Sequence, residues 1–316
     1  MSAEPGLVSV VVPNYNGAPF LAECLHSLRG QSYRPMETIL VDDASTDGSV
    51  GMARASFPEV RVIELLRNGG FARAANHGIV ASRGEIIALL NNDAVAEPEW
   101  LEELVGALNR HPEAGSVAAK VLLRGEPRTF NSAGDLFRRT GLPDNRGAWE
   151  LDLGQYDAED EIFGASAAAA AYRRALFEDV GLFDERFFMY CEDVDLAFRA
   201  QLAGHRCVYA PRAIVRHRLG ATGGSTLASY QCGRNFVWLL ARDVPGVVWR
   251  CHWRAILRAQ LALAKGALHH AHEPAARARL RGQLVGLLTS PRLLLERRRF
   301  SAKRRVSDDY IVGLLA

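Results

Sequence analysis

The 316-residue chain lacks the features that mark secreted, membrane-spanning and zinc-binding proteins. Its five cysteines are scattered and form no C-x-x-C pair, which argues against a disulfide framework or a zinc site and suits a reducing cytoplasm. The N-terminus has no basic stretch followed by an apolar one, so we expect no signal peptide. No apolar run reaches the roughly 20 residues of a membrane helix. We therefore expect a cytoplasmic protein, either soluble or peripheral on the inner face of the cell membrane.

The chain also lacks the glycine signatures of two common nucleotide-binding classes. Neither a G-x-G-x-x-G fingerprint nor a Walker loop is present, and Gly69-Gly70 could be an ordinary turn. A dinucleotide oxidoreductase is therefore a weak alternative. The phosphates of a bound nucleotide would need another source of positive charge, and a divalent metal would supply it.

Acidic residues are scarce near the C-terminus, although the net charge is only +2. From Arg242 to Arg305 the only acids are Asp243, Glu273 and Glu296. No nucleic-acid-reading motif accompanies the basic residues, so we expect no nucleic acid partner. Two interpretations stay open: a segment that lies on an anionic membrane surface, or a helical cap or oligomerisation element with a solvated basic face. The residues behind the membrane interpretation are Trp238, Leu239, Leu240, Trp249, Trp253, Arg292, Arg297, Arg298, Arg299, Lys303, Arg304 and Arg305.

What the chain does contain is an alternation of short apolar runs and helix-length segments. The runs lie at 8–12, 38–41, 60–63, 85–90 and 116–121, and the helical segments at about 18–30, 47–56, 71–82 and 97–110. This alternation predicts an α/β fold with a mostly parallel central sheet flanked by helices. We expect that domain to span 1–225, with a helical, basic C-terminal extension over 226–316.

The second half of the predicted domain is less regular. We expect a loop or insertion from Arg124 to Glu161. A run of small residues at 164–171 leads into a predicted helix at 173–180. A helix at about 192–203 and a strand at 206–210 follow, and then a separate segment, Ile214 to His217. Gly220, Gly223 and Gly224 predict a flexible loop that could close over a site.

Polar residues follow each of the first four apolar runs, where a parallel sheet binds its ligands. Asp42 and Asp43 either cap the next helix or bind a base and ribose. Asp93 either caps a helix or binds a hard metal, for which Asn91 and Asn92 offer further oxygen ligands. The complete set is Pro13-Asn14-Tyr15-Asn16, Asp42-Asp43, Asn68-Gly69-Gly70 and Asn91-Asn92-Asp93.

An apolar, aromatic run from Phe187 ends in the acids Glu192, Asp193 and Asp195. The acids could simply complement the start of a helix, but apolar surroundings also raise a carboxyl pKa and favour a catalytic base. On a helix Glu192 and Asp195 share a face and Asp193 is turned about 100° away, so we expect Asp195 to pair with Arg199. The nearby His217 is either a solvated histidine at a strand end or a metal ligand.

Taken in order, these motifs resemble those of family 2 glycosyltransferases of the GT-A fold, in particular the bacterial rhamnosyltransferase-like members. The matching segments, spread over about residues 7–240, are 10–17, 41–48, 68–72 with Asn76, 89–93, 180–185, 187–196, His217 and Arg234-Asn235. One departure is that the metal-binding triplet reads Asn-Asn-Asp, so it has one acid rather than two.

The resemblance implies a role for each matching residue. Asp193 would be the catalytic base with Glu192 beside it, and Asp93 and His217 would hold Mg²⁺ or Mn²⁺. The nucleotide-sugar pocket would contain Pro13, Asn14, Tyr15, Asn16, Asp42, Asp43, Asn68, Gly69, Asn76 and Asn92.

The resemblance also implies an activity, the inverting transfer of a sugar from a nucleotide diphosphate. The expected donor is dTDP-L-rhamnose, with a UDP-sugar second, and the acceptor is a hydroxyl of a cell-surface polysaccharide or lipid-linked glycan. A non-catalytic sugar-nucleotide or glycan-binding module is the alternative, prompted by the Asn-Asn-Asp triplet and opposed by the intact Glu192-Asp193 pair. The sequence leaves the oligomeric state open.

Overall fold

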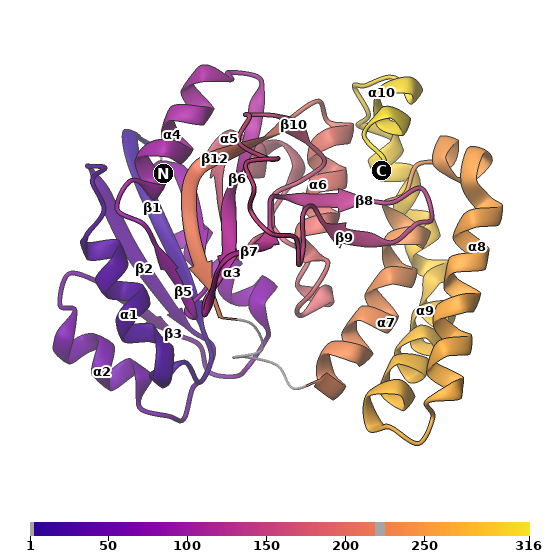
Figure 1. The fold of residues 1–316 in the computed structure, drawn as a ribbon, viewed down its shortest axis with the longest axis horizontal. Helices are drawn as coiled ribbons and strands as arrows, with labels where there is room; N and C mark the ends of the chain where they lie inside the picture. The colour runs from indigo at the N-terminus through magenta and orange to yellow at the C-terminus, as the bar shows by residue number, and fades with distance from the viewer. Residues whose placement is uncertain (1–2, 219–224) are drawn as a thin grey trace.

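Apolar strands that alternate with amphipathic helices build a central sheet with helices on both faces (Figure 1). The computed structural model describes residues 3–218 and 225–316. The strands are β1 (Glu4–Asn14), β2 (Met36–Asp42), β3 (Arg61–Glu64), β4 (Gly84–Leu90), β5 (Ala94–Ala96), β6 (Ala114–Leu123), β7 (Glu126–Ser132), β8 (Asp135–Phe137), β9 (Pro143–Asn145), β10 (Glu161–Ile162), β11 (Ala169–Arg173) and β12 (Arg206–His217). The helices are α1 (Ala18–Arg29), α2 (Ser49–Ser56), α3 (Phe71–Ala81), α4 (Trp100–Arg110), α5 (Arg174–Val180), the 3₁₀ turn η1 (Glu185–Phe187), α6 (Glu192–Leu202), α7 (Ser225–Arg242), α8 (Gly246–His269), α9 (Pro274–Ala302) and α10 (Asp308–Gly313).

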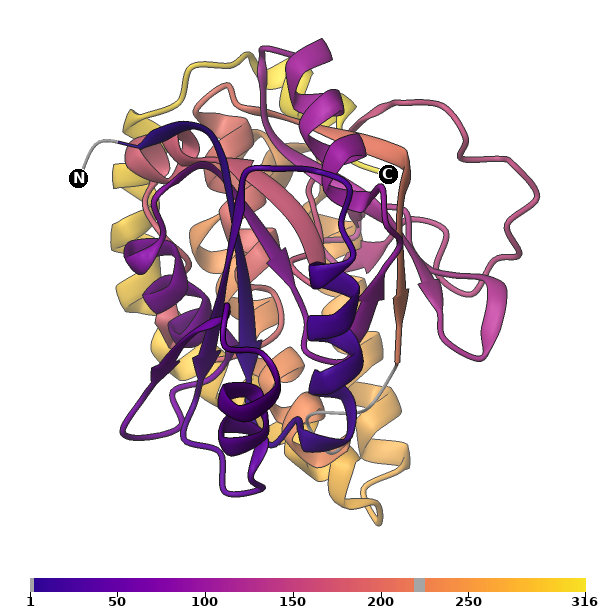
Figure 2. The same ribbon diagram turned by 90° about the vertical axis from the view of Figure 1, so that its left-hand side faces the viewer.

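The main sheet has the strand order β10-β12-β6-β11-β4-β1-β2-β3, with β5 paired to β12 and β7 to β6. The pairs β1–β2, β1–β4, β2–β3 and β6–β12 are parallel, so the predicted α/β class is confirmed. The carboxyl ends of β1, β2 and β4 therefore open at the same edge of the sheet. Figure 2 shows these N-terminal strands in front and the C-terminal helices behind them.

Successive side chains along the strands point to opposite faces of the sheet and pack into two separate hydrophobic cores. Val10 and Val12 of β1 pack in one core with helices α1, α2 and α4, whereas Val11 packs in the other with α3, α5 and α6. This two-sided burial explains why the strands read as continuous apolar runs rather than as alternating patterns.

The small-residue run at 164–171 differs from expectation. Its second half starts strand β11, which lies antiparallel between β4 and β6 and makes the sheet mixed. Ala169, Ala170 and Ala171 are buried, and helix α5 (Arg174–Val180) confirms the helix predicted at 173–180. Alanine carries no strong strand preference, so the sequence pattern does not reveal this strand.

Two further expectations are corrected. The segment 124–161 is not a plain loop, because it forms β7 and the β8–β9 hairpin. The segments 206–210 and 214–217 belong to one strand, β12, which has a register shift between Ala210 and Ile214. The predicted closing loop with Gly220, Gly223 and Gly224 lies outside the described residues.

Helices α7, α8 and α10 pack against α6 and the β8–β9 hairpin through a third core, and α9 packs on α7. This core includes Phe137, Phe198 and Leu240. The helices from α7 onward thus share a hydrophobic interior with the rest of the described chain, and the division expected near residue 225 stays a prediction. Over the described part of the chain, none of the helices combines the length and the apolar character needed to cross a membrane.

Candidate active site

A cavity of about 720 Å³ opens where the carboxyl ends of β1, β2 and β4 meet the start of α6. Its walls come from strand-end loops, from the β8–β9 hairpin and from α7. The lining includes Pro13, Asn14, Tyr15, Asp43, Asn68, Gly70, Asn91, Asn92, Asp93, Asn131, Asp135, Asp144, Asn145, Ala167, Phe188, Tyr190, Glu192, Asp193, His217, Leu227, Cys232 and Phe236. The strand ends singled out in the sequence thus converge with the carboxylate cluster in one cavity.

Asn14 organises the wall formed by the strand ends. Its Nδ2 donates to Oδ1 of Asp42 at 2.7 Å and to Oγ of Ser49 at 3.0 Å, and its Oδ1 accepts from Nδ2 of Asn92 at 2.7 Å. Asn14 is only 2% exposed, and Asp42 also accepts from the backbone N–H of Ser45 at 2.9 Å. This network holds the ends of β1, β2 and β4 in fixed positions relative to one another.

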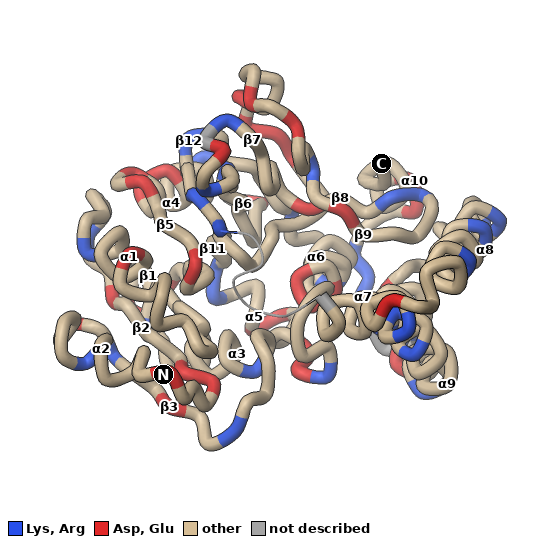
Figure 3. Tube along the Cα trace, turned by 60° about the horizontal axis from the view of Figure 1, so that its bottom comes forward, with Lys and Arg blue, Asp and Glu red and all other residues tan. Residues whose placement is uncertain are grey.

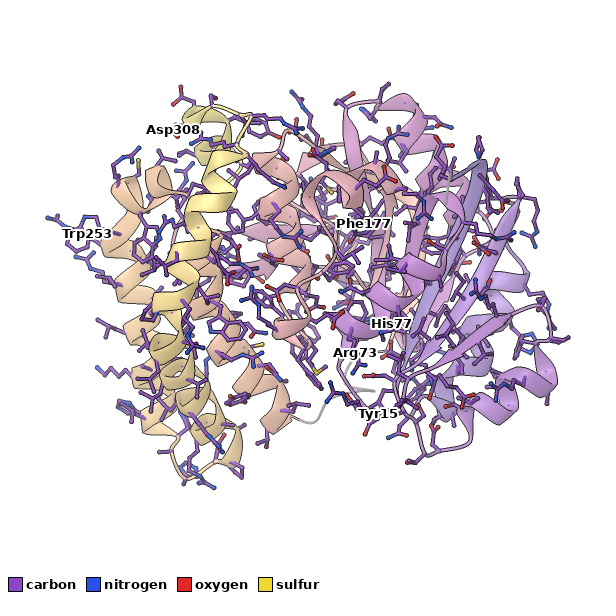
Figure 4. All side chains as sticks on the ribbon, turned by 180° about the vertical axis from the view of Figure 1, so that it is seen from behind. Tyr15, Arg73, His77, Phe177, Trp253 and Asp308 are labelled. Atoms are coloured by element: carbon purple, nitrogen blue, oxygen red, sulfur yellow. The ribbon has the colours of Figure 1, made fainter. Side chains whose placement is uncertain are left out.

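Asp43 connects the second strand end to the loop before α3. Its carboxylate accepts the backbone N–H groups of Gly69, at 2.9 Å, and Gly70, at 2.8 Å. Burial raises the pKa of Asp43, while these two N–H groups and the Arg73 guanidinium act in the opposite direction. Figure 4 labels Tyr15 and Arg73, which lie near this end of the sheet. Asp42 and Asp43 therefore tie loops together and do not cap α2, whose N-cap is Gly48.

Four residues expected in the pocket do not line the cavity. Asp42 and Gly69 lie directly behind it through the contacts just described, and Oδ1 of Asn16 accepts the N–H of Thr46 at 2.9 Å. Asn76 is used elsewhere: its Nδ2 donates to the Phe183 carbonyl at 2.9 Å, and its Oδ1 accepts the Phe183 N–H at 3.0 Å. In this structure Asn76 joins α3 to the segment before η1 instead of contacting the cavity.

Asp93 and His217 meet at the centre of the cavity wall. Oδ1 of Asp93 lies 3.0 Å from Nε2 of His217, yet this oxygen is buried and has no partner in hydrogen-bond geometry. Nδ1 of His217 contacts Oδ1 of Asn131 at 2.9 Å, and Nε2 faces Nδ2 of Asn91 at 3.3 Å. Because Asn131 Oδ1 can only accept, Nδ1 carries a hydrogen, and the neutral form of the ring therefore has its lone pair on Nε2, the nitrogen beside Asp93.

This pair fits a divalent metal. A buried carboxylate oxygen without a hydrogen bond lies 3.0 Å from an imidazole nitrogen, and both kinds of atom ligate divalent metals. Within the described residues, no three His, Cys, Asp or Glu side chains gather as a metal-binding group. A metal held by two protein ligands would keep waters and substrate phosphate oxygens as its other ligands, which is the manner of Mg²⁺.

Three carboxyl groups form another part of the cavity wall: Asp135 of β8 and Glu192 and Asp193 of α6. Figure 3 marks acidic positions in red, among them positions on α6 and on the β8–β9 hairpin. Burial and the charge of Asp193 raise the pKa of Glu192 well above its usual range. Burial, with the charges of Asp193 and Glu192, does the same for the pKa of Asp135. Oδ2 of Asp135 and Oε2 of Glu192 are buried without hydrogen-bond partners.

Asp193 differs from the other two acids. Burial raises its pKa, but its oxygens accept the backbone N–H groups of Val194, at 2.9 Å, and Ala167, at 3.3 Å, which favour the anion. Negative charge in the cluster is therefore most stable on Asp193. Asp135 and Glu192 are more easily held in the protonated form.

Asp195 has the structural role expected from the helix geometry. Its Oδ2 accepts from Nη2 of Arg199 at 2.7 Å, which confirms the predicted pair. Its Oδ1 contacts Arg242 of α7, and Arg242 also contacts Asp184. Asp195 is fully buried, so this ion network connects α6 to the helical bundle.

The sequence reading missed Asp135 and Asn131. Both flank Ser132-Ala133-Gly134 at the end of β7, in a stretch that reads as loop because of its glycines and prolines. The sequence pattern that could have indicated them is an Asn and an Asp on either side of a turn with a glycine, after a short strand. That pattern occurs at many turns without function, so by itself it would not identify a site.

The fold is that of GT-A glycosyltransferases. The mannosyltransferase PcManGT from Pyrobaculum calidifontis, solved with GDP-Man and Mn²⁺, superposes with a TM-score of 0.56 at 21% identity over 94% of this chain and 85% of that one. Staphylococcus aureus TarS 1-349, solved with UDP-GlcNAc, gives a TM-score of 0.54 at 17% identity over 87% and 90% of the two chains. At these identities the likeness concerns the fold.

Sequence comparison identifies the family. The model for Glycosyl transferase family 2 matches residues 9–181, more than half of the 316 residues. The chain is 30% identical over 282 residues to the N-acetylglucosaminyl-diphospho-decaprenol L-rhamnosyltransferase of Mycobacterium tuberculosis, which covers 81% of this chain and 91% of the relative. The chain belongs to glycosyltransferase family 2, and it is a glycosyltransferase.

Proposed function

We propose that this enzyme transfers L-rhamnose, with inversion, from dTDP-L-rhamnose onto a hydroxyl of a lipid-linked glycan during the synthesis of a cell-surface polysaccharide. The observation that carries the proposal is the similarity to the mycobacterial rhamnosyltransferase, whose name specifies both a rhamnosyl donor and a polyprenyl-diphosphate acceptor. This similarity reaches into the helical part of the chain, because 81% of the residues is more than the part of the chain that precedes α7.

In the proposed reaction Asp193 takes the proton of the acceptor hydroxyl. The hydroxyl oxygen then bonds to the anomeric carbon as the bond from that carbon to the diphosphate breaks, and the nucleotide diphosphate leaves. A single displacement inverts the configuration and needs no nucleophile from the enzyme. The N–H groups of Val194 and Ala167 support this role for Asp193, because they hold its carboxylate ready to accept a proton.

The wall around Asn14 and Asp43 would hold the nucleotide, with Tyr15 and Asn68 beside it. Mg²⁺ or Mn²⁺, bound by Asp93 and His217, would supply positive charge to the departing diphosphate. The alternative of a non-catalytic binding module is disfavoured, because Asp193 lines the cavity and two backbone N–H groups stabilise its carboxylate.

A thermal-shift panel with dTDP-L-rhamnose, UDP-GlcNAc and GDP-mannose, each with and without Mn²⁺, tests the donor. We expect the largest rise in Tm with dTDP-L-rhamnose, and only when Mn²⁺ is present. Mass spectrometry of a polyprenyl-diphospho-sugar acceptor should then show one added rhamnose. A larger shift with another sugar nucleotide would replace the proposed donor, and binding without any transfer would favour the binding module.

The helical bundle supplies a candidate membrane surface. Exposed apolar side chains recur on α8 at Trp253, Leu257, Leu261 and Leu268, and on α9 at Leu284, Leu287, Leu288 and Leu295. The exposed residues Arg254, Arg258, Lys265, Arg281 and Arg292 lie on the same helices. Trp253 projects away from the rest of the molecule (Figure 4). Because basic and apolar groups occur together, we propose that this surface lies on the anionic inner leaflet, close to a lipid-linked acceptor.

Pelleting with vesicles that contain phosphatidylglycerol tests this attachment. We expect the double variant Leu287→Gln/Leu288→Gln to pellet less than the unmodified protein. Leu66→Gln is the matched control, because Leu66 is fully exposed but lies between β3 and α3. Equal pelleting of all three proteins would remove the membrane proposal, and a change in molar mass on substitution would point to an oligomer interface instead.

A further inference from the structure

The segment Phe187–Cys191, which leads into α6, has an unusual backbone. Phe188, Tyr190 and Cys191 have φ angles of 66°, 67° and 69°, in the left-handed region that residues with a Cβ rarely adopt. The N–H of Met189 donates to the carbonyl of Phe187 at 2.8 Å, and Phe188 has ψ −64°. These values describe the rarer, strained form of the γ-turn. Such a backbone persists only where surrounding groups impose it.

Asn235 of α7 supplies much of that restraint. It is fully buried, and its Nδ2 donates to the carbonyls of Tyr190 at 2.7 Å, Met189 at 3.1 Å and Phe187 at 3.2 Å. One amide group therefore gathers three carbonyl oxygens from the same short segment. A regular helix or strand would have paired these oxygens within the backbone, so the unusual conformation depends on an outside donor.

Arg234 reinforces the arrangement. Its Nη2 donates to the carbonyls of Arg186 and Phe187, both at 2.9 Å. Its Nε donates to Oδ1 of Asn235 at 2.9 Å. Because Oδ1 is engaged by Arg234, the amide NH₂ of Asn235 must face the segment. The two residues thus act together.

The other end of the segment is attached to the nucleotide side of the cavity. The N–H of Ala72 in α3 donates to the carbonyl of Phe188 at 3.2 Å. Gly70 allows this approach, since a Cβ there would lie 2.3 Å from the same carbonyl oxygen. Gly70 is in turn held by Asp43. The segment therefore spans from the loop beside the expected nucleotide to the first turn of α6.

We infer that Arg234 and Asn235 are positioning residues that set the direction of Asp193 through the segment Phe187–Cys191. Neither residue lines the cavity, whereas their helix neighbours Cys232 and Phe236 do. Asp193 comes two residues after Cys191, the N-cap of α6, so the conformation at Cys191 determines where the carboxylate points. This role rests on the proposed function, in which Asp193 is the base.

Asn235→Leu tests the inference, because leucine has a similar shape but no donor. We expect kcat for rhamnose transfer to fall about 100-fold, since a misplacement of about 1 Å at a reacting group has an effect of that order. The KM for the donor should stay within twofold, because the hydrogen bonds that Asn14 and Asp43 make in the nucleotide wall involve neither Asn235 nor the segment. Hydrogen exchange measured on the full chain without substrates should be faster at residues 188–195. Arg234→Met should show the same pattern with a smaller fall in kcat, and it carries the test if Asn235→Leu does not fold.

Thr289→Val is the matched control. Oγ1 of Thr289 accepts from Nε1 of Trp238 at 2.8 Å, so the substitution weakens the packing of α7 on α9 but leaves in place the hydrogen bonds that Arg234 and Asn235 make to the segment. Trp238 also packs against Phe187 and Arg234, so this control separates the effect of those hydrogen bonds from an effect of packing alone. We expect a lower Tm with kcat and exchange at 188–195 unchanged. A general loss of stability would instead affect the control and the Asn235 variant alike.

The results separate the inference from the proposed function. Unchanged kcat and unchanged exchange in Asn235→Leu would overturn the positioning role. A fall in kcat with an equal rise in donor KM would also overturn it, because the effect would then lie in binding. The unmodified protein could instead transfer no sugar while Asn235→Leu still shows faster hydrogen exchange at residues 188–195. In that case Arg234 and Asn235 do hold the segment, and the proposed glycosyl transfer is wrong.

Discussion

The two sides of the cavity differ in how their polar groups are held. On the donor side, which the strand ends form, Asn14 hydrogen-bonds to both Asp42 and Asn92, and the buried oxygen without a partner, Oδ1 of Asp93, lies where a metal would bind. On the carboxyl side, Asp135 and Glu192 each have a buried oxygen without a partner, and the backbone before them is in left-handed conformations. The donor side resembles a preformed binding site. The carboxyl side holds groups in states that folding alone would not favour, as expected where proton transfer occurs.

The substitution Asp193→Asn should have the largest effect and tests whether the carboxyl side performs the chemistry. It removes the base while leaving a similar shape, so we expect kcat to fall about 10²- to 10⁴-fold. Donor binding by calorimetry should be unchanged, because the donor side is separate. Transfer at an unchanged rate would show that Asp193 is not the base.

The substitution Asn14→Leu tests the donor side. It would leave buried polar groups of Asp42 and Asn92 unsatisfied, and each such group costs about 1–3 kcal/mol. We expect a clear loss in the free energy of unfolding, measured by chemical denaturation, together with weaker donor binding. Asn109→Ala on the exposed surface of α4 is the control and should change neither. A variant as stable as the unmodified protein would mean that the network is not a structural element.

The donor side was largely predictable from the sequence, because parallel strands bring their carboxyl ends together. That rule was enough to gather Asn14, Asp43, Asn68, Asn92 and Asp93. The pairing of Asp195 with Arg199 was also predictable, since a helix brings residues four apart onto one face. Both inferences depend on local periodicity.

The carboxyl side, formed by Asp135, Glu192 and Asp193, was harder to predict from the sequence, because contacts between residues far apart in the chain define it. Asp135 joins the cluster from a hairpin that read as a loop, and β11 reaches the sheet as an alanine run without strand character. Asn76 matched a nucleotide-pocket motif, yet its amide contacts Phe183, 107 residues further along the chain. No local pattern indicates which partner a buried amide will find at such a separation.

The substitution Glu192→Gln tests whether Glu192 and Asp193 have different roles in the reaction. Burial and the charge of Asp193 raise the pKa of Glu192 and so favour its protonated form, which glutamine imitates. We therefore expect kcat near pH 7 to fall less than about tenfold, far less than for Asp193→Asn. Steady-state kinetics of the two variants in parallel provide the measurement. The reverse order of effects would transfer the role of base to Glu192.

The substitution Asp135→Asn should have the smallest effect. It tests whether the buried carboxyl groups lower the stability of the folded protein as the pH rises. Burial and the charges of Asp193 and Glu192 raise the pKa of Asp135 well above its usual range, so the folded state binds a proton that the unfolded state releases above about pH 4. Stability is therefore lost as pH rises from that value toward the folded-state pKa. The asparagine variant has no such proton, so its Tm should decline less between pH 5 and pH 8 than that of the unmodified protein. Parallel Tm profiles for the two proteins would indicate that Asp135 is ionised in the folded state, and the carboxyl side would then be as well satisfied as the donor side.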